Sequence, residues 1–444
     1  MDFREIAEAP LGPRARVYEH GWQSWSPTGV YPATETSPRA PSARAQTVHY
    51  RPGTRSPERG FQAAGLLAFD PGDGGPVRIW SAPAPEREVP DIRAQARDGR
   101  LLISADGDVE ESSHTAALWG ALESWAGSVA RRAGVAEIPS LAPGWCTWYH
   151  YFTDVREEDV LENLAAMRRL DLGISLVQVD DGYQAEIGDW LERSPRFPHP
   201  LTELTGRIRA DGRRAGIWVA PLLVGARSRL AAEHPDWLVD GADAGHNWDQ
   251  QLAALDVTHP GAASYLQDVF GSLARWGFEF FKVDFMYAGA LAGRRHSDIT
   301  AVAAYREAVR LIREAIGRDA TLLGCGAPIL PSVGLYDAMR VSPDVGPVYE
   351  PREGDLGSPS QRSAVLTGRA RAFQHGRFWV NDPDCLIVRP EVERREDWAE
   401  HVERFGALRM SSDRLEALDG WGLETTRRLL RPSSPEPFDL STLP

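Results

Sequence analysis

A lysine and an aspartate two positions apart are the first residues in this sequence whose types and spacing could do chemistry. Lys282 and Asp284 lie in the run Phe278–Met286, whose apolar residues predict a strand of a parallel sheet that is buried on both faces. Strand side chains share a face at every second residue, so Lys282 and Asp284 project on the same side. Lys282 is the only lysine among the 49 Lys and Arg residues of the chain. The pair predicts either a catalytic carboxylate with its cation or a structural ion pair.

A second candidate carboxylate, Asp344, follows a later apolar run. Two carboxylates on separate strand ends can face each other across a bound sugar, as glycoside hydrolysis requires. Lys282 favours the charged form of Asp284, which suits a nucleophile, whereas a desolvated Asp344 could hold its proton and act as the general acid. Arg340 would lower the pKa of Asp344 if the two shared a face, so we assign Arg340 mainly to substrate hydroxyls. A loop-capping role for Asp344 is the alternative.

Two adjacent carboxylates, Asp180 and Asp181, end another apolar run. Each can accept hydrogen bonds from a different sugar hydroxyl, and a wrong epimer would leave a buried charge unpaired. Trp218 could offer a flat apolar face to the sugar ring or fill the core. Metal ligation is disfavoured because, of the 11 histidines, only His150 falls at a predicted strand end. We therefore expect no metal.

Regular alternation of strands and helices from Gly144 onward is the pattern that must position these side chains. Helices are predicted over Val160–Leu170, Ile299–Ile316 and Gly422–Leu430. No Gly-rich nucleotide-binding turn follows any strand, so a (β/α)8 barrel is favoured over an open doubly wound sheet. The eight predicted strands are Gly144–Tyr149, Ser175–Asp180, Gly216–Pro221, Phe278–Asp284, Thr321–Cys325, Ala338–Ser342, Arg377–Asn381 and Gly406–Ser411.

Residues 1–138 differ, because short apolar runs at 65–69 and 99–103 alternate with Pro, Gly and Asp turns. We predict a β-rich, sandwich-like domain there that ends in a helix over 115–132. The barrel with a short tail then occupies residues 139–444. Trp22 and Trp25 lie in a loop-like stretch of the first domain and are candidates either for its core or for the site.

Composition limits the classes of partner. The net charge of −14 and the pI near 5.3 argue against binding nucleic acid or an anionic membrane surface. No basic region followed by an apolar run opens the chain, and no stretch of about 18 apolar residues occurs. Three scattered cysteines fit free thiols in a reducing compartment. These features predict a cytoplasmic protein, and they leave its oligomeric state open.

Eight motifs are spread along the chain: 21-GWQSWS-26, 144-GWCTWY-149, 180-DDGY-183, 188-GDW-190, 216-GIWVAP-221, 282-KVD-284, 340-RVSPD-344 and 381-NDPDC-385. In these motifs the chain resembles glycoside hydrolase family 36, the α-galactosidases of melibiase type, over nearly its whole length. The resemblance implies a retaining double displacement on a terminal α-galactoside, with Asp284 as nucleophile and Asp344 as acid/base, and no cofactor. It also implies that the following residues bind the sugar: Asp180, Asp181, Trp218, Lys282, Arg340, Tyr149, Cys325 and Trp25 or Trp22.

Two motifs depart from the family pattern. The second-strand motif ends in Tyr183 where tryptophan is usual, and the fifth strand continues Cys325-Gly326-Ala327-Pro328 in place of a glycine-rich loop. That loop commonly frames the substituent at C2, so galactose and N-acetylgalactosamine both stay open, as does galactosyl transfer. Two other classes are a galactoside-binding protein without catalysis and a metal-dependent barrel hydrolase.

Overall fold

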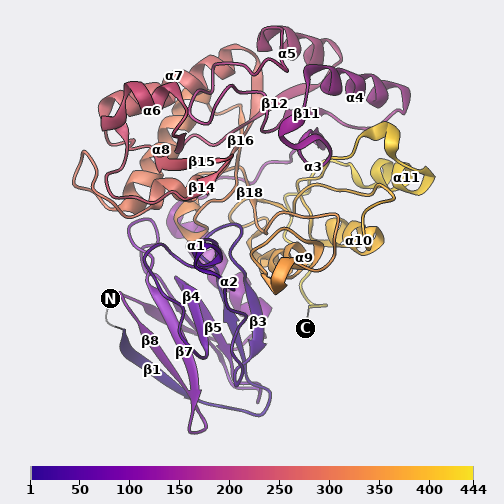
Figure 1. The fold of residues 1–444 in the computed structure, drawn as a ribbon. Helices are drawn as coiled ribbons and strands as arrows, with labels where there is room; N and C mark the ends of the chain where they lie inside the picture. The colour runs from indigo at the N-terminus through magenta and orange to yellow at the C-terminus, as the bar shows by residue number, and fades with distance from the viewer. Residues whose placement is uncertain (1–2, 444) are drawn as a thin grey trace.

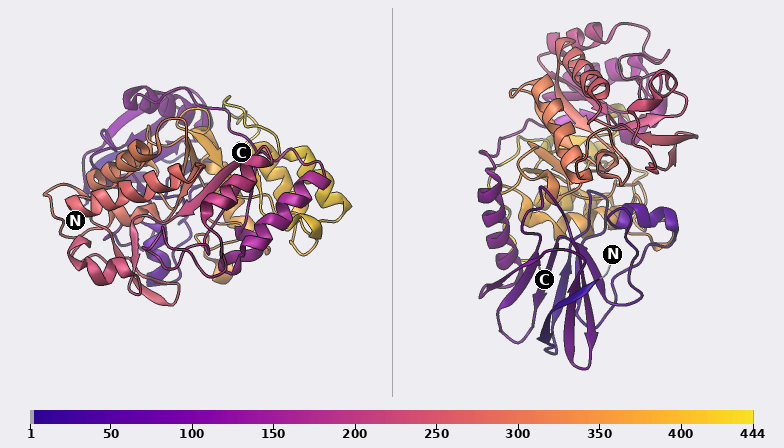
Figure 2. Two further views of the ribbon diagram at one scale, coloured as in Figure 1. Left: turned by 90° about the horizontal axis from the view of Figure 1, so that it is seen from above. Right: turned by 90° about the vertical axis from the view of Figure 1, so that its left-hand side faces the viewer.

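The computed structural model describes residues 3–443, so the outer limits of the two predicted domains, residues 1 and 444, lie outside the described part. A β-domain, which holds strands β1 to β9, lies beneath a larger body of strands and helices (Figure 1). The second view in Figure 2 shows helix α2 (Leu118–Ala133) along one side of the contact between the two parts. The helix predicted over 115–132 is therefore present.

Two antiparallel sheets form the β-domain, with strand orders β1-β8-β7-β4 and β3-β2-β5-β6-β9. Apolar side chains of both sheets, including Phe61, Phe69 and Trp80, share one buried cluster. The predicted sandwich-like arrangement is thus confirmed. The bounds are β1 (Arg4–Pro10), β2 (Arg16–Glu19), β3 (Gly29–Pro32), β4 (Phe61–Ala64), β5 (Leu66–Asp70), β6 (Val77–Ser81), β7 (Asp91–Arg97), β8 (Arg100–Ala105) and β9 (Glu110–His114), with the short helix α1 (Ala43–His49) between β3 and β4.

Eight parallel strands form the second part in the order β19-β18-β17-β16-β12-β11-β10-β20. Their bounds are β10 (Gly144–Cys146), β11 (Leu176–Val179), β12 (Arg214–Val219), β16 (Phe278–Val283), β17 (Thr321–Gly324), β18 (Ala338–Arg340), β19 (Val380–Asp382) and β20 (Met410–Ser411). The curled sheet closes because the Leu408 N–H donates to the Asn381 carbonyl (3.0 Å) and the Leu386 N–H donates to the Met410 carbonyl (2.6 Å). Each predicted strand overlaps one observed strand, so the (β/α)8 barrel is confirmed.

Helices cover the outside of this barrel (Figures 1 and 2). Helix α4 begins at Glu157, earlier than predicted. Its first turn consists of Glu157, Glu158 and Asp159, whose negative charges interact favourably with the positive end of the helix dipole. The main bounds are α4 (Glu157–Arg169), α5 (Leu201–Ala210), α7 (Pro260–Arg275), α8 (Ala301–Ile316), α9 (Gln361–Ala370), α10 (Arg395–Phe405) and α11 (Gly420–Leu429), with the shorter α3 (Trp148–Tyr151) and α6 (Arg229–Glu233). No helix among residues 3–443 is long and apolar enough to cross a membrane.

Two local features differ from the sequence prediction. The first strand stops at Cys146, and Trp148–Tyr151 form the helical turn α3, so Tyr149 is not part of a strand. In addition, the chain between β12 and α7 forms a small antiparallel sheet of β13 (Leu223–Gly225), β14 (His246–Asn247) and β15 (Gln250–Ala254). A two-residue turn, Trp248-Asp249, joins β14 to β15. This hairpin brings an additional indole ring to the barrel mouth.

The β-domain docks on the barrel through its 21–27 loop. Ser24 N–H donates to the Ala327 carbonyl (3.1 Å), and Ile329 N–H donates to the Trp22 carbonyl (2.9 Å), so the loop pairs with the chain that follows β17. From the barrel side, the fully buried Arg371 donates to the carbonyls of Ser24 (2.6 Å) and Gln23 (2.8 Å), and to those of Gly21, Ser26 and Val341. Burial lowers the pKa of Arg371 to about 9. One arginine therefore fixes the loop that carries Trp25.

Candidate active site

A cavity of about 480 Å³ opens where the barrel strands end at their carboxyl side. Seven of the predicted residues line it, namely Asp284, Asp344, Asp180, Asp181, Trp218, Lys282 and Trp25. Arg340, Tyr149 and Cys325 do not line it, and Trp22 is buried in the core. Another cavity, of about 500 Å³, lies between residues 135–139 and α8, next to the amino ends of β18 and β19. Barrel enzymes place their chemistry at the carboxyl ends, so the first cavity is the candidate site.

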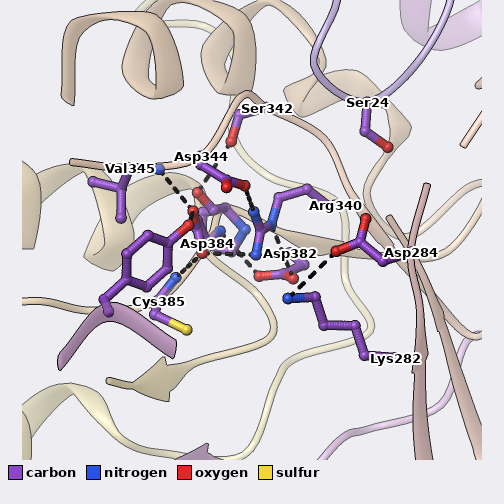
Figure 3. A network of polar contacts seen from close by, with 12 residues as sticks. Ser24, Lys282, Asp284, Arg340, Ser342, Asp344, Val345, Asp382, Asp384 and Cys385 are labelled. Carbon is purple, nitrogen blue, oxygen red and sulfur yellow. Dashed lines mark hydrogen bonds and ion pairs between the residues drawn. The ribbon is translucent and has the colours of Figure 1, made fainter. Parts of the chain in front are cut away.

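Asp284 follows the last residue of β16 and receives positive or donor groups from three directions. Trp218 Nε1–H donates to Oδ2 (3.0 Å), and the Phe285 backbone N–H donates to Oδ1 (2.8 Å). Lys282 Nζ lies 3.8 Å from Oδ2, an ion pair that is drawn in Figure 3. The indole that was expected to offer its face to a sugar thus also orients a carboxylate by its edge. These contacts complement the negative charge of Asp284 and fix its two oxygens.

Lys282 bridges two carboxylates. Its Nζ donates to Asp180 Oδ2 at 2.9 Å, closer than its contact with Asp284, and its side chain is only 7% exposed. Burial alone would lower the pKa of Lys282, but Asp180 and Asp284 raise it well above its ordinary value. Asp180 Oδ2 also accepts from Gln178 Nε2 at 2.6 Å. Lys282 therefore stays charged and holds Asp180 and Asp284 at one edge of the cavity.

Asp181 is held by side chains that are not on barrel strands. Gln184 Nε2 donates to Oδ1 (2.6 Å), and Trp248 Nε1 donates to Oδ2 (2.7 Å). Burial raises the pKa of Asp181 to about 6, the two donors oppose this, and Asp180 and Asp284 add to it. The carboxylate form therefore predominates above pH 6, where it can accept hydrogen bonds from a ligand.

Asp344 lies on the other side of the cavity, beyond the end of β18. Arg340 Nη1 donates to Asp344 Oδ1 at 2.8 Å, and the side chain of Asp344 is 31% exposed. Loss of hydration raises the pKa of Asp344, Arg340 and Lys282 oppose the increase, and Asp284 and Asp180 add to it. The direction matches a carboxyl group that keeps its proton more readily than an ordinary aspartate. The acid role of Asp344 stays a prediction, and Arg340, which was expected mainly at substrate hydroxyls, contacts this carboxyl group.

Arg340 is enclosed by carboxylates behind the cavity wall (Figure 3). Besides Asp344, it contacts Asp382 through Nε (3.3 Å) and Asp384 through Nη2 (2.7 Å), and its side chain is 3% exposed. Tyr149, which was predicted to bind substrate, donates its hydroxyl to Asp384 instead. Because all three nitrogens of the guanidinium have carboxylate partners, Arg340 is placed to position Asp344.

Aromatic rings form one wall of the cavity. Phe285 lies between Trp25, at a ring distance of 5.0 Å, and Trp248, at 5.2 Å. Phe285, Trp248 and Asp249 all have positive φ angles, of 52°, 49° and 54°. Bulky side chains are rare there, and such strain concentrates at functional sites. The wall therefore combines one ring from the β-domain, one from the end of β16 and one from the β14–β15 hairpin.

Close packing surrounds the chain after β17. Cys325 is 1% exposed, so its thiol lies behind the cavity surface. Gly326 has φ +53°, and a side chain there would lie 2.9 Å from the Trp25 ring and 3.0 Å from the Phe285 nitrogen. Only glycine fits this contact. The chain after β17 therefore has glycine at the position that Trp25 covers.

Sequence reasoning missed several lining residues, of which Trp248 donates a hydrogen bond to Asp181 (2.7 Å). The others are Thr153, His246, Asn247, Asp249 and Phe285, whereas Trp148, which also lines the cavity, lies in the first predicted strand. It also missed Asp382 and Asp384 as partners of Arg340, although both lie in a strand-end motif. The signal for Trp248 was weak, because tight hairpins usually carry Asn-Gly or Asp-Gly at the turn.

Comparisons with known proteins find similarity to α-galactosidases. A family model for melibiase matches residues 134–308. The probable α-galactosidase G of Emericella nidulans is 29% identical over 145 residues, which cover 29% of this chain and 19% of that protein. The matched segments span about a fifth of the length of the curated relatives.

Solved structures extend the likeness to the entire chain. The α-galactosidase of Thermus thermophilus in complex with p-nitrophenyl α-D-galactopyranoside has a TM-score of 0.79 and 26% identity, covering 100% of this chain and 97% of that chain. The same enzyme in complex with stachyose gives a TM-score of 0.78 and 27% identity, over 96% of each chain. The α-galactosidase AgaA of Geobacillus stearothermophilus shares the fold, with a TM-score of 0.62 at 14% identity, over 96% of this chain and 61% of that chain.

Proposed function

We propose that the chain is a member of the melibiase family of glycoside hydrolases and a retaining α-galactosidase that removes terminal α-linked galactose from small oligosaccharides. The observation that carries the proposal is the pair Asp284 and Asp344, which line one cavity in contrasting surroundings. Asp284 is surrounded by donors, and the pKa of Asp344 is raised. A nucleophile and an acid need these two environments.

In the first step, Asp284 attacks C1 of the galactose, and the bond from C1 to the leaving oxygen breaks. Trp218 and the Phe285 N–H support this role because they hold both oxygens of the carboxylate in one orientation. Asp344 gives its proton to the leaving oxygen, so the aglycone departs as a neutral alcohol. The product of this step is a galactosyl ester of Asp284.

In the second step, Asp344 acts as a base. It takes a proton from water while the water oxygen attacks C1, which releases galactose and restores the Asp284 carboxylate. The exposed part of Asp344, 31% of its side chain, supports this step because water can reach it from the cavity. Two inversions at C1 leave the α configuration unchanged.

Recognition of the sugar falls to the charged edge formed by Asp180, Asp181 and Lys282. Carboxylates that accept from substrate hydroxyls and an ammonium that donates to one would read the positions of those hydroxyls. An epimer would leave one of these buried charges unpaired, which discriminates strongly. Trp25 and Trp248 would contact the apolar faces of the ligand.

An N-acetylgalactosaminidase of the same mechanism is the second candidate. The observation that favours it is the loop Cys325-Gly326-Ala327, which departs from the usual glycine-rich sequence where the C2 substituent is commonly framed.

The cytoplasm is the proposed compartment, supported by three buried free thiols, Cys146, Cys325 and Cys385.

Hydrolysis of p-nitrophenyl α-D-galactopyranoside and of the matching α-N-acetylgalactosaminide tests the assignment. We expect turnover of the first, little of the second, and a loss of about 10⁴-fold or more in Asp284→Ala with an unchanged melting profile. Normal turnover in Asp284→Ala would refute the nucleophile. Faster turnover of the N-acetylated substrate would favour the second candidate, and binding of galactose without hydrolysis would refute both. A chelator should have no effect.

A further inference from the structure

Asp384 is a buried carboxylate that the double displacement does not use. It lies two residues beyond β19, is 1% exposed, and shares Arg340 with Asp344 (Figure 3). We propose that Asp384 is a positioning residue for the acid/base, because by drawing Arg340 to itself it leaves Asp344 able to keep the proton that the leaving oxygen takes. This inference rests on the proposed function and adds to that function the group that sets the protonation of Asp344.

The geometry of Arg340 is the first support. One guanidinium carries one positive charge, yet it faces Asp344, Asp382 and Asp384 at 2.8, 3.3 and 2.7 Å. The register of β18 and β19 sets Arg340 opposite Asp382, so the cation is tied to the neighbouring strand. A single positive charge divided among three carboxylates cannot stabilise the charged form of each of them fully.

The fixed position of Asp384 is the second support. Its Oδ2 accepts from the Val345 N–H (2.7 Å) and from the Tyr149 hydroxyl, and its Oδ1 accepts from the Cys385 N–H (2.6 Å). Its φ angle of 89° is unusual for a residue other than glycine. Val345, whose N–H donates to Asp384, is the residue that follows Asp344 in the chain. Asp384 therefore holds both the backbone beside the acid and the cation that faces it.

The charges around Asp344 and Asp384 determine in which direction Asp384 shifts the pKa of Asp344. Burial raises the pKa of Asp384 to about 7; Arg340 opposes this, and Asp344 and Asp382 add to it. Above pH 7 a charged Asp384 competes with Asp344 for Arg340 and disfavours a second negative charge beside it. The other charged or titratable groups that act on the two carboxylates are Lys282, Asp284, Asp180, Tyr149, Cys325 and Cys385. Removing the charge of Asp384 should therefore lower the pKa of Asp344.

The pH dependence of kcat/KM in Asp384→Asn tests the proposal. Asparagine keeps an acceptor oxygen and tolerates a positive φ better than most residues. We expect the alkaline limb of the profile to move to lower pH by about one unit, since Arg340 then serves Asp344 more fully. The shift should be seen with melibiose, whose sugar leaving group needs a proton. It should be smaller with 2,4-dinitrophenyl α-D-galactopyranoside, whose leaving group departs without one.

Two further variants separate this role from a structural one. Tyr149→Phe removes the hydroxyl donor to Asp384, so Asp384 holds its own proton to higher pH, and we expect a smaller shift in the same direction. Asp91→Asn is the matched control, because Asp91 is 1% exposed and shares Arg51 with Asp106 inside the β-domain. It should lower the melting temperature and leave the pH profile unchanged.

The possible outcomes distinguish the role of Asp384 from the proposed function. An alkaline limb that stays in place in folded Asp384→Asn, or an equal shift with both substrates, would overturn the role of Asp384 while the proposed function stands. If Asp384→Asn does not fold, an unshifted Tyr149→Phe profile would overturn it in the same way. A wild-type protein that hydrolyses no α-galactoside would overturn both the proposed function and this inference.

Discussion

Two cations serve the two sides of the cavity, and they are used differently. On one side, Lys282 bridges Asp180 and Asp284, and the Asp284 oxygens receive additional donors from Trp218 and the backbone. On the other side, Arg340 faces three carboxylates. The first side supplies donors to both oxygens of the nucleophile. The second has more negative charge than one cation can balance, which favours a carboxyl group that keeps its proton.

The geometry of each cation suits its side. A lysine ammonium is a compact point charge that can sit between two carboxylates in a space where its side chain is 7% exposed. An arginine guanidinium is a planar fork that can reach the ends of two neighbouring strands at once. The comparison teaches that the roles of two chemically identical carboxyl groups depend on how many carboxylates share the cation that each of them contacts.

Lys282→Arg is the most severe way to break this comparison. The wider guanidinium cannot occupy the position 2.9 Å from Asp180 and 3.8 Å from Asp284 without displacing one of them. We expect kcat/KM to fall roughly 100-fold or more, because misplacement of the reacting groups by about 1 Å has this cost. Steady-state kinetics with p-nitrophenyl α-D-galactopyranoside measure the loss, and a melting curve checks the fold. Activity near wild type would mean that the lone lysine is interchangeable.

Arg371→Lys is expected to have a smaller effect, and it extends the comparison to a buried cation that donates to backbone carbonyls. Arg371 donates to backbone carbonyls of the 21–27 loop and to Val341, near Asp344. Lysine has fewer donors, so Trp25 should lose its fixed position and kcat/KM should fall about tenfold.

The Trp25→Ala background provides the control for Arg371. If Arg371 acts through Trp25, Arg371→Lys should cost little in a chain that already lacks the ring. Equal fold losses in the two backgrounds would show that Arg371 acts by another route, such as its contact with Val341.

Much of this arrangement could be predicted from the sequence. The eight apolar runs that end in polar residues were sufficient to place the barrel strands in order, because buried parallel strands need such runs. The same rule brought Asp180, Lys282 and Asp284 to one edge of the sheet. Trp25 was found through its motif, although its reach across to the barrel depends on Arg371 and on glycine at position 326.

Side-chain partners were harder to predict than positions. Arg340 was assigned to substrate hydroxyls, but the register that sets it beside Asp382 turns it toward carboxylates, and register is not visible in one sequence. Tyr149 was counted as a strand end, yet the strand stops at Cys146 and the tyrosine bonds to Asp384. Trp248 was missed because its turn has neither glycine nor proline.

The anomeric configuration of the first sugar released is the measurement that tests the central claim most directly. Proton NMR of wild-type protein with p-nitrophenyl α-D-galactopyranoside, recorded before mutarotation, distinguishes the two products. Double displacement through Asp284 and Asp344 predicts α-galactose as the initial product. Initial β-galactose would show a single displacement by water, and would contradict the assignment of Asp284 as the nucleophile.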